Sequence, residues 1–429
     1  MESPSAGPVP ANIGLRLSIM MFLQFFVWGA WYVTLGPFMT AKGMSPESVG
    51  NAYSVGPLAA ILSPVFLGMF ADRFFATQRV LGVMHLLGGL ALLAAPSLVP
   101  AAGGSPWPFV GILLAHMLCY MPTLGLSNTL AFHNMTNPEK QFPMVRVLGT
   151  IGWIVAGFVV GYMAKQMSPG ADETTRASMP HFFYAAGISS LVLGVFSFTL
   201  PHTPPQAKGK SASVGELLGF GAVSLMRERS FAVFVVCSFL ICIPLSAYYS
   251  FAGMYAGATG LENVPVKMSF GQMSEIAFML VMPLCFARLG VKWMLAVGML
   301  AWVARYALFA AGWGGIGGSH VTWMVLGGII LHGICYDFFF VTGQIYVDKK
   351  APVAIRGQAQ GFLVLVTQGL GMLIGAQIVG RLVAHYTTGT GPAASIDWKS
   401  VWIAPAAMAL AVLVVFVVLF KEKGRPARE

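Results

Sequence analysis

Charged side chains are scarce in this sequence. Asp, Glu, Lys and Arg make up only 9% of the 429 residues, whereas 57% are hydrophobic. A soluble fold of this length cannot bury so much apolar surface, so the composition excludes an ordinary soluble protein and predicts that lipid is the solvent. The formal net charge of +10 comes mainly from short loops between apolar runs, which is typical of an orientation signal and does not predict nucleic-acid binding.

Cysteine is rare as well. The five cysteines all lie inside apolar runs, and none has the spacing of metal ligands: Cys119, Cys237, Cys242, Cys285 and Cys335. They are therefore interpreted as small core residues, and no metal site is expected. The first apolar run begins near Leu15 without a basic segment before it or a small-residue cleavage site, so it is expected to be a membrane helix and not a signal peptide.

Long apolar runs dominate the rest of the chain. Each of twelve runs can cross a hydrocarbon layer of about 30 Å at about 1.5 Å per residue. They are expected near residues 15–39, 48–70, 78–98, 106–132, 142–164, 181–201, 230–256, 267–287, 291–313, 320–346, 354–384 and 399–420. With both termini in the cytoplasm, seventeen Lys and Arg residues face that side and six face the other. The positive-inside rule therefore predicts cytoplasmic termini.

The longest polar stretch, residues 202–229, divides the spans into six plus six. Its Pro, Lys and Ser content indicates a cytoplasmic linker, with a short amphipathic helix around Val214–Met226. The expected parts are a tail at 1–14, a six-helix half at 15–201, the linker, a second half at 230–420 and a tail at 421–429. This all-α membrane fold of twelve transmembrane helices is typical of the major facilitator superfamily, whose substrate site lies between the halves.

A loop motif supports this fold. The loop after the second span reads GMFADRFFATQR and resembles the superfamily motif G-x-x-x-D-R-x-G-R-K at Gly68, Asp72, Arg73 and Arg79. Phe75 stands in place of the second Gly. The corresponding loop after the eighth span keeps Arg288, Gly290 and Lys292 but lacks the acid. The expected role is a charged latch that gates the cytoplasmic ends of the helices.

Two carboxylates lie deep inside apolar runs. Glu275 falls in SFGQMSEIAFMLVMPLCF and Asp337 in GIILHGICYDFFFVTGQIYV. An acid at mid-membrane depth costs about 2.5–3.5 kcal/mol, faces the bundle interior or water, and usually marks an ion or substrate path. The pair therefore predicts a proton-coupled transporter.

Helical spacing arranges further polar residues into stripes. Four spans carry one: Gln24, Trp28 and Trp31; Arg146, Thr150 and Trp153; Gln272 and Glu275; and His332 and Tyr336, with Asp337 about 100° round the helix. Amide and guanidinium groups suit the hydroxyls and base edge of a nucleoside, and aromatic faces suit its flat base.

Each stripe also has a structural interpretation. The Arg146 side chain could extend to the cytoplasmic surface. Three polar residues could bond between helices instead of binding a ligand: Gln24, Thr150 and Gln272. Trp28 and Trp31 could pack the core. Packing or gating is the favoured interpretation of three more residues: His85, His116 and Arg305.

Six strings closely resemble the bacterial nucleoside:proton symporter family, in the same order and spacing from about residue 15 to 421. They are LQFFVWGAWYVTLG, YMPTLGLSNTLAF, RVLGTIGW, GQMSE, AWVARYALFA and CYDFFFVTGQIYVDK. The resemblance implies inward transport of nucleosides driven by the proton gradient. It assigns substrate contacts to Arg146, Thr150, Trp153, Gln272, Glu275 and Tyr336, and proton coupling to Asp337. Trp153 and Tyr336 stand where the family has Phe.

Three further substrate positions depart from the family pattern. Ser246 and Tyr249 stand in place of a Gln and an Asn, and His332 in place of a Tyr. These changes alter hydrogen-bond partners, so the selectivity among nucleosides is open. His332 could also titrate near neutral pH and join the proton path.

The expected mechanism is alternating access. Asp337 takes up a proton, with Glu275 as the other candidate carrier, while Arg146 and other polar residues bind the nucleoside. No cofactor, metal or catalytic residue is expected, and the partners are nucleoside, proton and membrane lipid. A bacterial inner membrane and a monomer are the expected setting.

Other functions stay open on the sequence alone. A symporter for a sugar or another polar metabolite would use the same machinery. A drug:proton antiporter would share the loop motif but needs fewer paired hydrogen-bonding residues. A membrane-embedded transferase would need a cluster of His, Asp or Glu at a membrane face. A passive channel or a non-transporting sensor is not excluded by the sequence.

Overall fold

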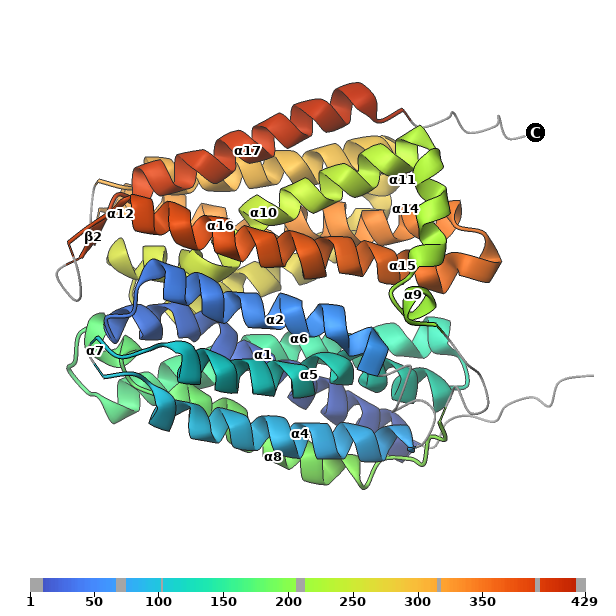
Figure 1. Ribbon diagram of the computed structural model, residues 1–429, viewed down its shortest axis with the longest axis horizontal. Coiled ribbons are helices and arrows are strands. Elements are labelled where there is room, and N and C mark those ends of the chain that lie inside the picture. The colour runs from blue at the N-terminus through green and yellow to red at the C-terminus, as the bar shows by residue number, and fades with distance from the viewer. Residues whose placement is uncertain are drawn as a thin grey trace, which may run out of the picture. The chain divides into compact units, whose positions relative to one another are not determined.

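The computed structural model describes residues 11–66, 75–101, 103–205, 213–314, 318–389 and 394–421. Most of these residues form helices (Figure 1). The chain divides into two compact units. Unit 1 comprises Met1–Phe38 and Leu62–Ala212, and unit 2 comprises Met39–Ile61 and Ser213–Glu429.

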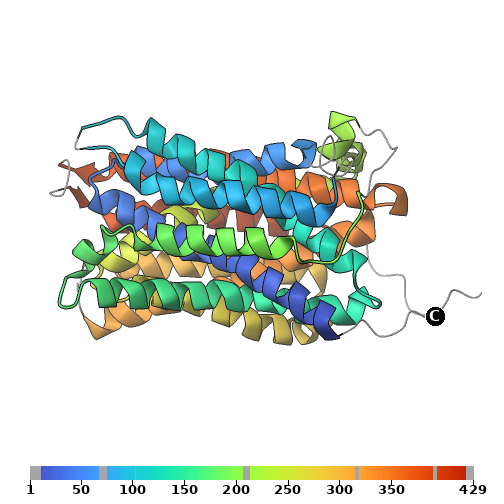
Figure 2. The ribbon, with the colours of Figure 1, turned by 90° about the horizontal axis from the view of Figure 1, so that it is seen from below.

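Helices of unit 1 match the first, third, fourth, fifth and sixth predicted spans. They are α1 (Ala11–Ala41, up to Phe38), α4 (Thr77–Ala94) with the 3₁₀ turn η2 (Ala95–Leu98), α5 (Trp107–His133), α6 (Pro138–Met167), α7 (Glu173–Ala177) and α8 (His181–Ser197). α4 packs against both α5 and α8, as Figure 2 shows from below.

Glycines bring α4 and α8 close together. A Cβ atom at Gly82 would lie 3.0 Å from the carbonyl oxygen of Gly194, and one at Gly89 would lie 3.0 Å from that of Gly187. Small residues of this kind let helix backbones approach closely. The resulting van der Waals contacts stabilise the helix pair in a membrane, where the hydrophobic effect contributes little because the lipid tails are apolar too. The high glycine content of the sequence therefore contributes to helix packing as well as to loops.

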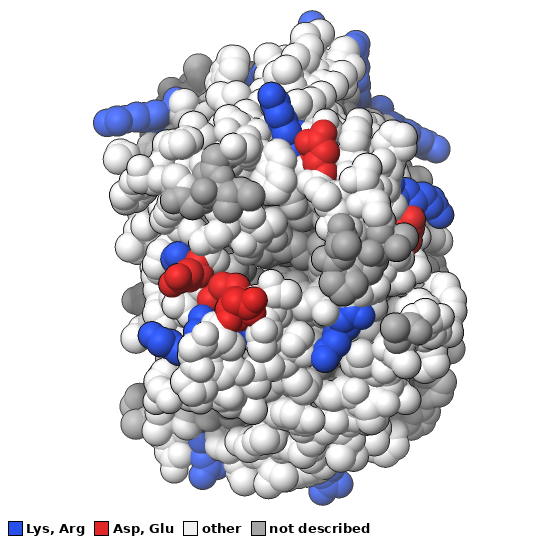
Figure 3. Space-filling view, turned by 90° about the vertical axis from the view of Figure 1, so that its left-hand side faces the viewer, with Lys and Arg blue, Asp and Glu red and all other residues white. Residues whose placement is uncertain are grey.

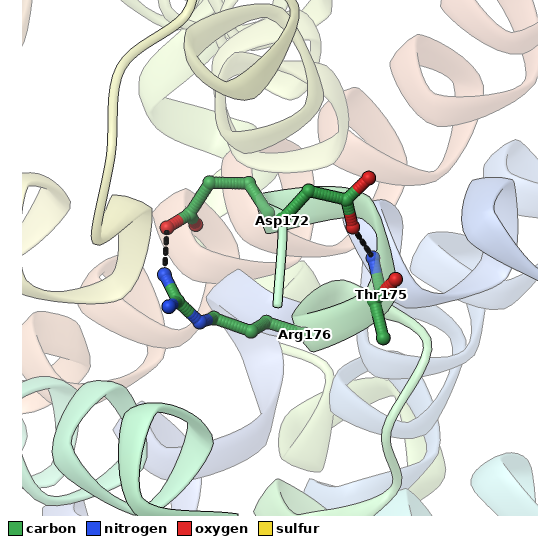
Figure 4. A network of polar contacts seen from close by, with 4 residues as sticks. Asp172, Thr175 and Arg176 are labelled. Atoms are coloured by element: carbon green, nitrogen blue, oxygen red, sulfur yellow. Dashed lines mark hydrogen bonds and ion pairs between the residues drawn. The ribbon is translucent and has the colours of Figure 1, made fainter. Parts of the chain in front are cut away.

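The short helix α7 is fixed by its own charged residues (Figure 4). Asp172 caps it by accepting a hydrogen bond of 2.8 Å from the backbone N–H of Thr175, and Arg176 pairs with Glu173 at 3.0 Å. The hydrogen bonds from Thr175 hold the pKa of Asp172 below its ordinary value. This cap therefore weakens only as the pH falls through that lowered pKa. In the view of Figure 3, charged side chains are scattered among uncharged ones.

Unit 2 holds the other spans. Its elements are α2 (Pro46–Phe66, up to Ile61), α9 (Val214–Leu217), η3 (Phe220–Arg227), α10 (Arg229–Ala258), α11 (Val264–Ala311), α12 (Ser319–Ile330), α13 (His332–Cys335), η4 (Tyr336–Val341), α14 (Thr342–Lys350), η5 (Val353–Ile355), α15 (Arg356–Val364), η6 (Leu365–Gly371), α16 (Met372–His385) and α17 (Trp398–Leu419). Strands β1 (Thr387–Thr388) and β2 (Ser395–Ile396) pair antiparallel. α10 and α11 both pack on α17, and α10 also packs on α16 (Figure 1).

Ten helices in the described residues are long and apolar enough to cross a membrane. One of them, α11, has 48 residues and is broken at Gly290, where φ is 67° and ψ is 179°. Only glycine adopts such a backbone without strain, so the break separates the predicted spans 267–287 and 291–313. α2 adds a 21-residue helix at the second expected span. The all-helical fold class is therefore confirmed, with helical segments at each of the twelve expected places.

Two cytoplasmic features predicted from sequence have different outcomes. The predicted linker helix is present as α9, whose N-terminus is capped by a capping box of Ser213 and Glu216. The 3₁₀ helix η3 follows it. This segment packs closely on α15. Three members of the predicted latch, Gly68, Asp72 and Arg73, lie outside the described residues; Arg79 is exposed in the first turn of α4.

Candidate functional site

The predicted stripe of span five is present on α6 in unit 1. Arg146, Thr150 and Trp153 are all half-buried. The Arg146 guanidinium lies 4.1 Å from the centre of the Phe25 ring of α1, so it forms a cation–π contact within unit 1. The structure therefore places the charge against α1.

Aromatic rings gather beside this stripe. Trp153 packs edge-to-face on Trp28, with ring centres 5.4 Å apart, and Trp28 also contacts Tyr32 and Tyr120 at 5.7 Å. The approach depends on Gly29, where a Cβ atom would lie 2.9 Å from Trp153. Trp28 and Trp153 are both half-buried, so each keeps some ring surface that a flat base could contact.

A buried hydrogen-bond network lies beneath this cluster. The Gln24 amide donates to Thr123 at 2.7 Å, and its oxygen lies 2.9 Å from His85 Nε2. The other ring nitrogen of His85, Nδ1, lies 3.1 Å from the hydroxyl oxygen of Ser190 on α8. The Tyr120 hydroxyl donates to the backbone carbonyl of Gln24 at 2.7 Å. The network joins α1, α4, α5 and α8. Gln24 therefore bonds between helices, as the structural interpretation of its stripe predicts.

Replacing Gln24 by Leu is expected to destabilise the protein. The change leaves the buried Nε2 of His85 without a partner, at a cost of about 1–3 kcal/mol, and removes one of the two hydrogen bonds of the Thr123 hydroxyl, which still donates to the carbonyl of Tyr120. Thermal unfolding in detergent should show a clear fall in the melting temperature. Gln166 is exposed on α6, so Gln166→Leu is the matched control. Equal melting temperatures for the two variants would show that the network contributes nothing to stability.

In unit 2 the acids of spans eight and ten lie on helices in close contact. A Cβ atom at Gly333 of α13 would lie 2.6 Å from the backbone of Ser274 on α11, next to Glu275. The Ser274 hydroxyl accepts a hydrogen bond of 3.1 Å from the Gly333 N–H. A Cβ atom at Gly271 would likewise lie 3.1 Å from that of His332. These glycines fix the Glu275 face of α11 against the helix that carries His332.

His332 is the centre of an aromatic cluster. Its ring stacks on Tyr248 of α10 at 5.3 Å with an interplanar angle of 18°, and packs edge-on to Tyr249 at 6.2 Å. Tyr336 lies one helical turn further along the same face, with its ring centre 6.0 Å from that of His332. Tyr249 and Tyr336 are half-buried, whereas His332 is only 3% exposed. The structure thus brings three of the predicted substrate residues together.

Asp337 lies in the π-helical turn η4, a rare geometry that occurs mostly at functional sites. Its side chain is fully buried, and neither carboxylate oxygen has a hydrogen-bond partner among the described residues. Glu275, on the neighbouring helix, lies close enough for the two charges to interact. Glu275 and Gln272 are half-buried on one face of α11. An acid left without partners in an apolar setting is suited to taking up and releasing a proton.

Unit 2 holds two further polar residues: Ser246, which is predicted from the sequence as a substrate position, and Gln368, which is not. Ser246 is fully buried, its hydroxyl donates to the carbonyl of Ile243 at 2.7 Å, and it packs against Gly375 of α16. Gln368 is a further half-buried amide, in the second π-helical turn η6, that the helical stripes do not single out. Its position in the middle of an apolar run is the signal that would have found it.

Arg305 is the other residue whose setting the stripes do not predict. It is fully buried in α11 and stacks on Tyr248.

No group of three or more His, Cys, Asp or Glu side chains placed to hold a metal ion is found in the described ranges.

Comparisons with known proteins agree with this geometry. The family model described as "Nucleoside H+ symporter" matches residues 11–425. YegT of Escherichia coli (strain K12) is 39% identical, over 95% of this chain and 93% of its own length. The nucleoside permease NupG of the same organism is 31% identical, over 96% and 97%.

Solved structures give the same result. The crystal structure of the nucleoside transporter NupG matches with a TM-score of 0.81 at 30% identity, covering 96% of this chain and 100% of that one. A D-xylose-proton symporter, at 14% identity, shares the fold with a TM-score of 0.71 over 96% and 98%. These are transporters and not enzymes, and the resemblance found in the sequence strings is confirmed. The chain belongs to the nucleoside H+ symporter family of integral membrane transporters.

Proposed function

We propose that this protein imports nucleosides together with protons by alternating access. The observation that carries the proposal is Asp337: a fully buried acid in a π-helical turn, without a hydrogen-bond partner in the described structure. Such a group is costly when charged inside a membrane, so protonation removes a barrier to closing the site around it. Membership of the nucleoside H+ symporter family supports the nucleoside as the solute.

Substrate contacts are proposed in each unit separately, beginning with unit 1. Arg146 and Thr150 of α6 supply hydrogen-bonding groups, and Trp153 supplies a ring face. In unit 2 the proposed contacts come from α10, α11, α13 and η4: Ser246, Tyr249, Gln272, Glu275, His332 and Tyr336. The half-buried groups of Gln272, Glu275, Tyr249 and Tyr336 suit ribose hydroxyls and a base edge. Ser246 takes part only as an acceptor or after its bond to Ile243 breaks, because its hydroxyl proton already has a partner.

The proton step is assigned to Asp337. Glu275, whose charge interacts with that of Asp337, is the second candidate for the proton carrier. The loop residues Gly68, Asp72, Arg73 and Arg79 are proposed to gate the cytoplasmic side. A bacterial inner membrane, cytoplasmic termini and a monomer that needs no cofactor complete the proposal. The NupG relative is named as a nucleoside permease, and another relative, 28% identical, as a xanthosine permease. These names support the solute class and leave the preferred base open.

The test is uptake of labelled uridine and adenosine into proteoliposomes. With an inward proton gradient we expect accumulation above the external concentration, and a protonophore should abolish it. Uptake that only equilibrates, with or without the gradient, would indicate a passive channel. Folded protein that takes up neither nucleoside would contradict the proposal, and sugars and other polar metabolites would then be screened as solutes.

A further inference from the structure

Arg305 is a buried cation that the proposed transport cycle does not use. It lies within α11, its side chain is 0% exposed, and its Nε donates to the carbonyl oxygen of Gly328 on α12 at 3.0 Å. Nη1 and Nη2 have no hydrogen-bond partner in the described part of the chain. A charge at this depth is expensive and is retained mainly where it has a function.

Among the described residues, no carboxylate forms an ion pair with this guanidinium. The ion pairs found among the described residues all lie elsewhere, between Arg176 and Glu173, Lys350 and Glu228, and Arg356 and Asp348. The ionisable side chains whose fields reach Arg305 are Tyr248, Tyr249, Tyr306, Cys335 and His332. These groups come from α10, α11 and α13 and include no acid. A pure ion-pair role is therefore not what holds Arg305 in place.

The guanidinium instead contacts an aromatic face. Its Cζ lies 4.0 Å from the centre of the Tyr248 ring, the geometry of a cation–π contact. Tyr248 in turn stacks on His332, whose ring contacts both Tyr249 and Tyr336. Tyr248 is only 2% exposed, so it lies behind the half-buried Tyr249 and Tyr336. The contacts form one continuous path from Arg305 to the proposed substrate residues.

We propose that Arg305 is a positioning residue for nucleoside binding, which acts through the ring of Tyr248 on His332 and Tyr249. It neither touches the nucleoside nor carries the proton. The attraction between the guanidinium and the ring fixes the orientation of Tyr248, and the stacked Tyr248 ring fixes His332. A preordered surface loses less side-chain entropy when the solute binds, so its effect appears in affinity. The inference rests on the proposed function, because it assigns a role within that substrate site.

The test measures uridine uptake by single and double variants. Arg305→Gln is expected to raise the KM about tenfold, which is less than the full value of a desolvated cation–π contact, while Vmax and the gradient-driven accumulation ratio stay within about twofold. Arg305→Lys keeps the charge without the flat guanidinium and should give an intermediate KM. Tyr248→Leu should raise the KM as much as Arg305→Gln. The double variant should be no worse than Tyr248→Leu alone, because both changes break the same path.

Arg381 is an exposed arginine on α16 of the same unit, and Arg381→Gln is the matched control with an unchanged KM. An unchanged KM in folded Arg305→Gln would overturn the proposal, as would KM effects that multiply in the double variant. Loss of accumulation at constant KM would place Arg305 in the proton path instead, which also contradicts it. If Arg305→Gln does not fold, Tyr248→Leu decides by itself. An unchanged KM in that variant would show that the Tyr248 ring does not position the substrate residues, and it would overturn the proposal. Wild-type protein that takes up no nucleoside would contradict the proposed function before any variant is made.

Discussion

Replacing Asp337 by Asn is expected to abolish gradient-driven accumulation of nucleosides while exchange of nucleosides across the membrane continues. Asn has nearly the shape of a protonated Asp but can neither release nor take up the proton. Because Asp337 is fully buried and has no partner in the described residues, no other bond has to be broken when its charge is removed. The accumulation ratio should fall to about one, which corresponds to the loss of all coupling free energy.

The measurement compares two assays on the same proteoliposomes. Uphill uptake under a proton gradient should disappear, whereas counterflow against preloaded unlabelled uridine should persist. Asp348, at the end of the same span, is half-exposed and pairs with Arg356 at 3.3 Å. An exposed pair of this kind contributes about 0–1 kcal/mol, so Asp348→Asn should behave as wild type. Full accumulation by Asp337→Asn would remove this acid from the coupling step and leave Glu275 as the carrier.

Much of the fold could be predicted from the sequence because lipid imposes simple rules. A span must be long, apolar and helical, so the run lengths alone locate α1, α5, α10 and α17. The stripe on α6 is also predicted correctly, since i, i+4, i+7 spacing fixes a common face on any helix. The break at Gly290 divides the 48-residue helix α11 into the two predicted spans.

The settings of single side chains could not be predicted, because they depend on contacts between spans. Nothing near Gln24 in the sequence reveals that His85 and Thr123 satisfy its amide. The contact of Arg305 with Tyr248 joins residues from two different helices. Likewise, no periodicity in the sequence encodes the π-helical turn at Asp337.

Replacing Gly333 by Ala is expected to impair both folding and uptake, although it adds a single methyl group. The new Cβ would lie 2.6 Å from the backbone carbonyl of Ser274 and 2.7 Å from the nitrogen of Glu275. Real Cβ atoms do not approach backbone so closely, so α13 and α11 have to separate. Overpacking of this kind costs about 1–3 kcal/mol, and it also stretches the bond from Gly333 to Ser274. The melting temperature should fall, and uridine affinity should fall by roughly tenfold.

Gly327→Ala provides the matched control within the same span. A Cβ atom there meets only the flexible end of Leu308 at 3.5 Å, an ordinary contact. Ala is the better helix former, so this variant should be as stable as wild type or more stable by about 0.4–1 kcal/mol, with normal uptake. The pair separates two roles of glycine, because the amino-acid change is identical and only the neighbouring backbone differs. If Gly333→Ala matched Gly327→Ala in stability and affinity, the close approach of α13 to α11 would not be what positions Glu275 and His332.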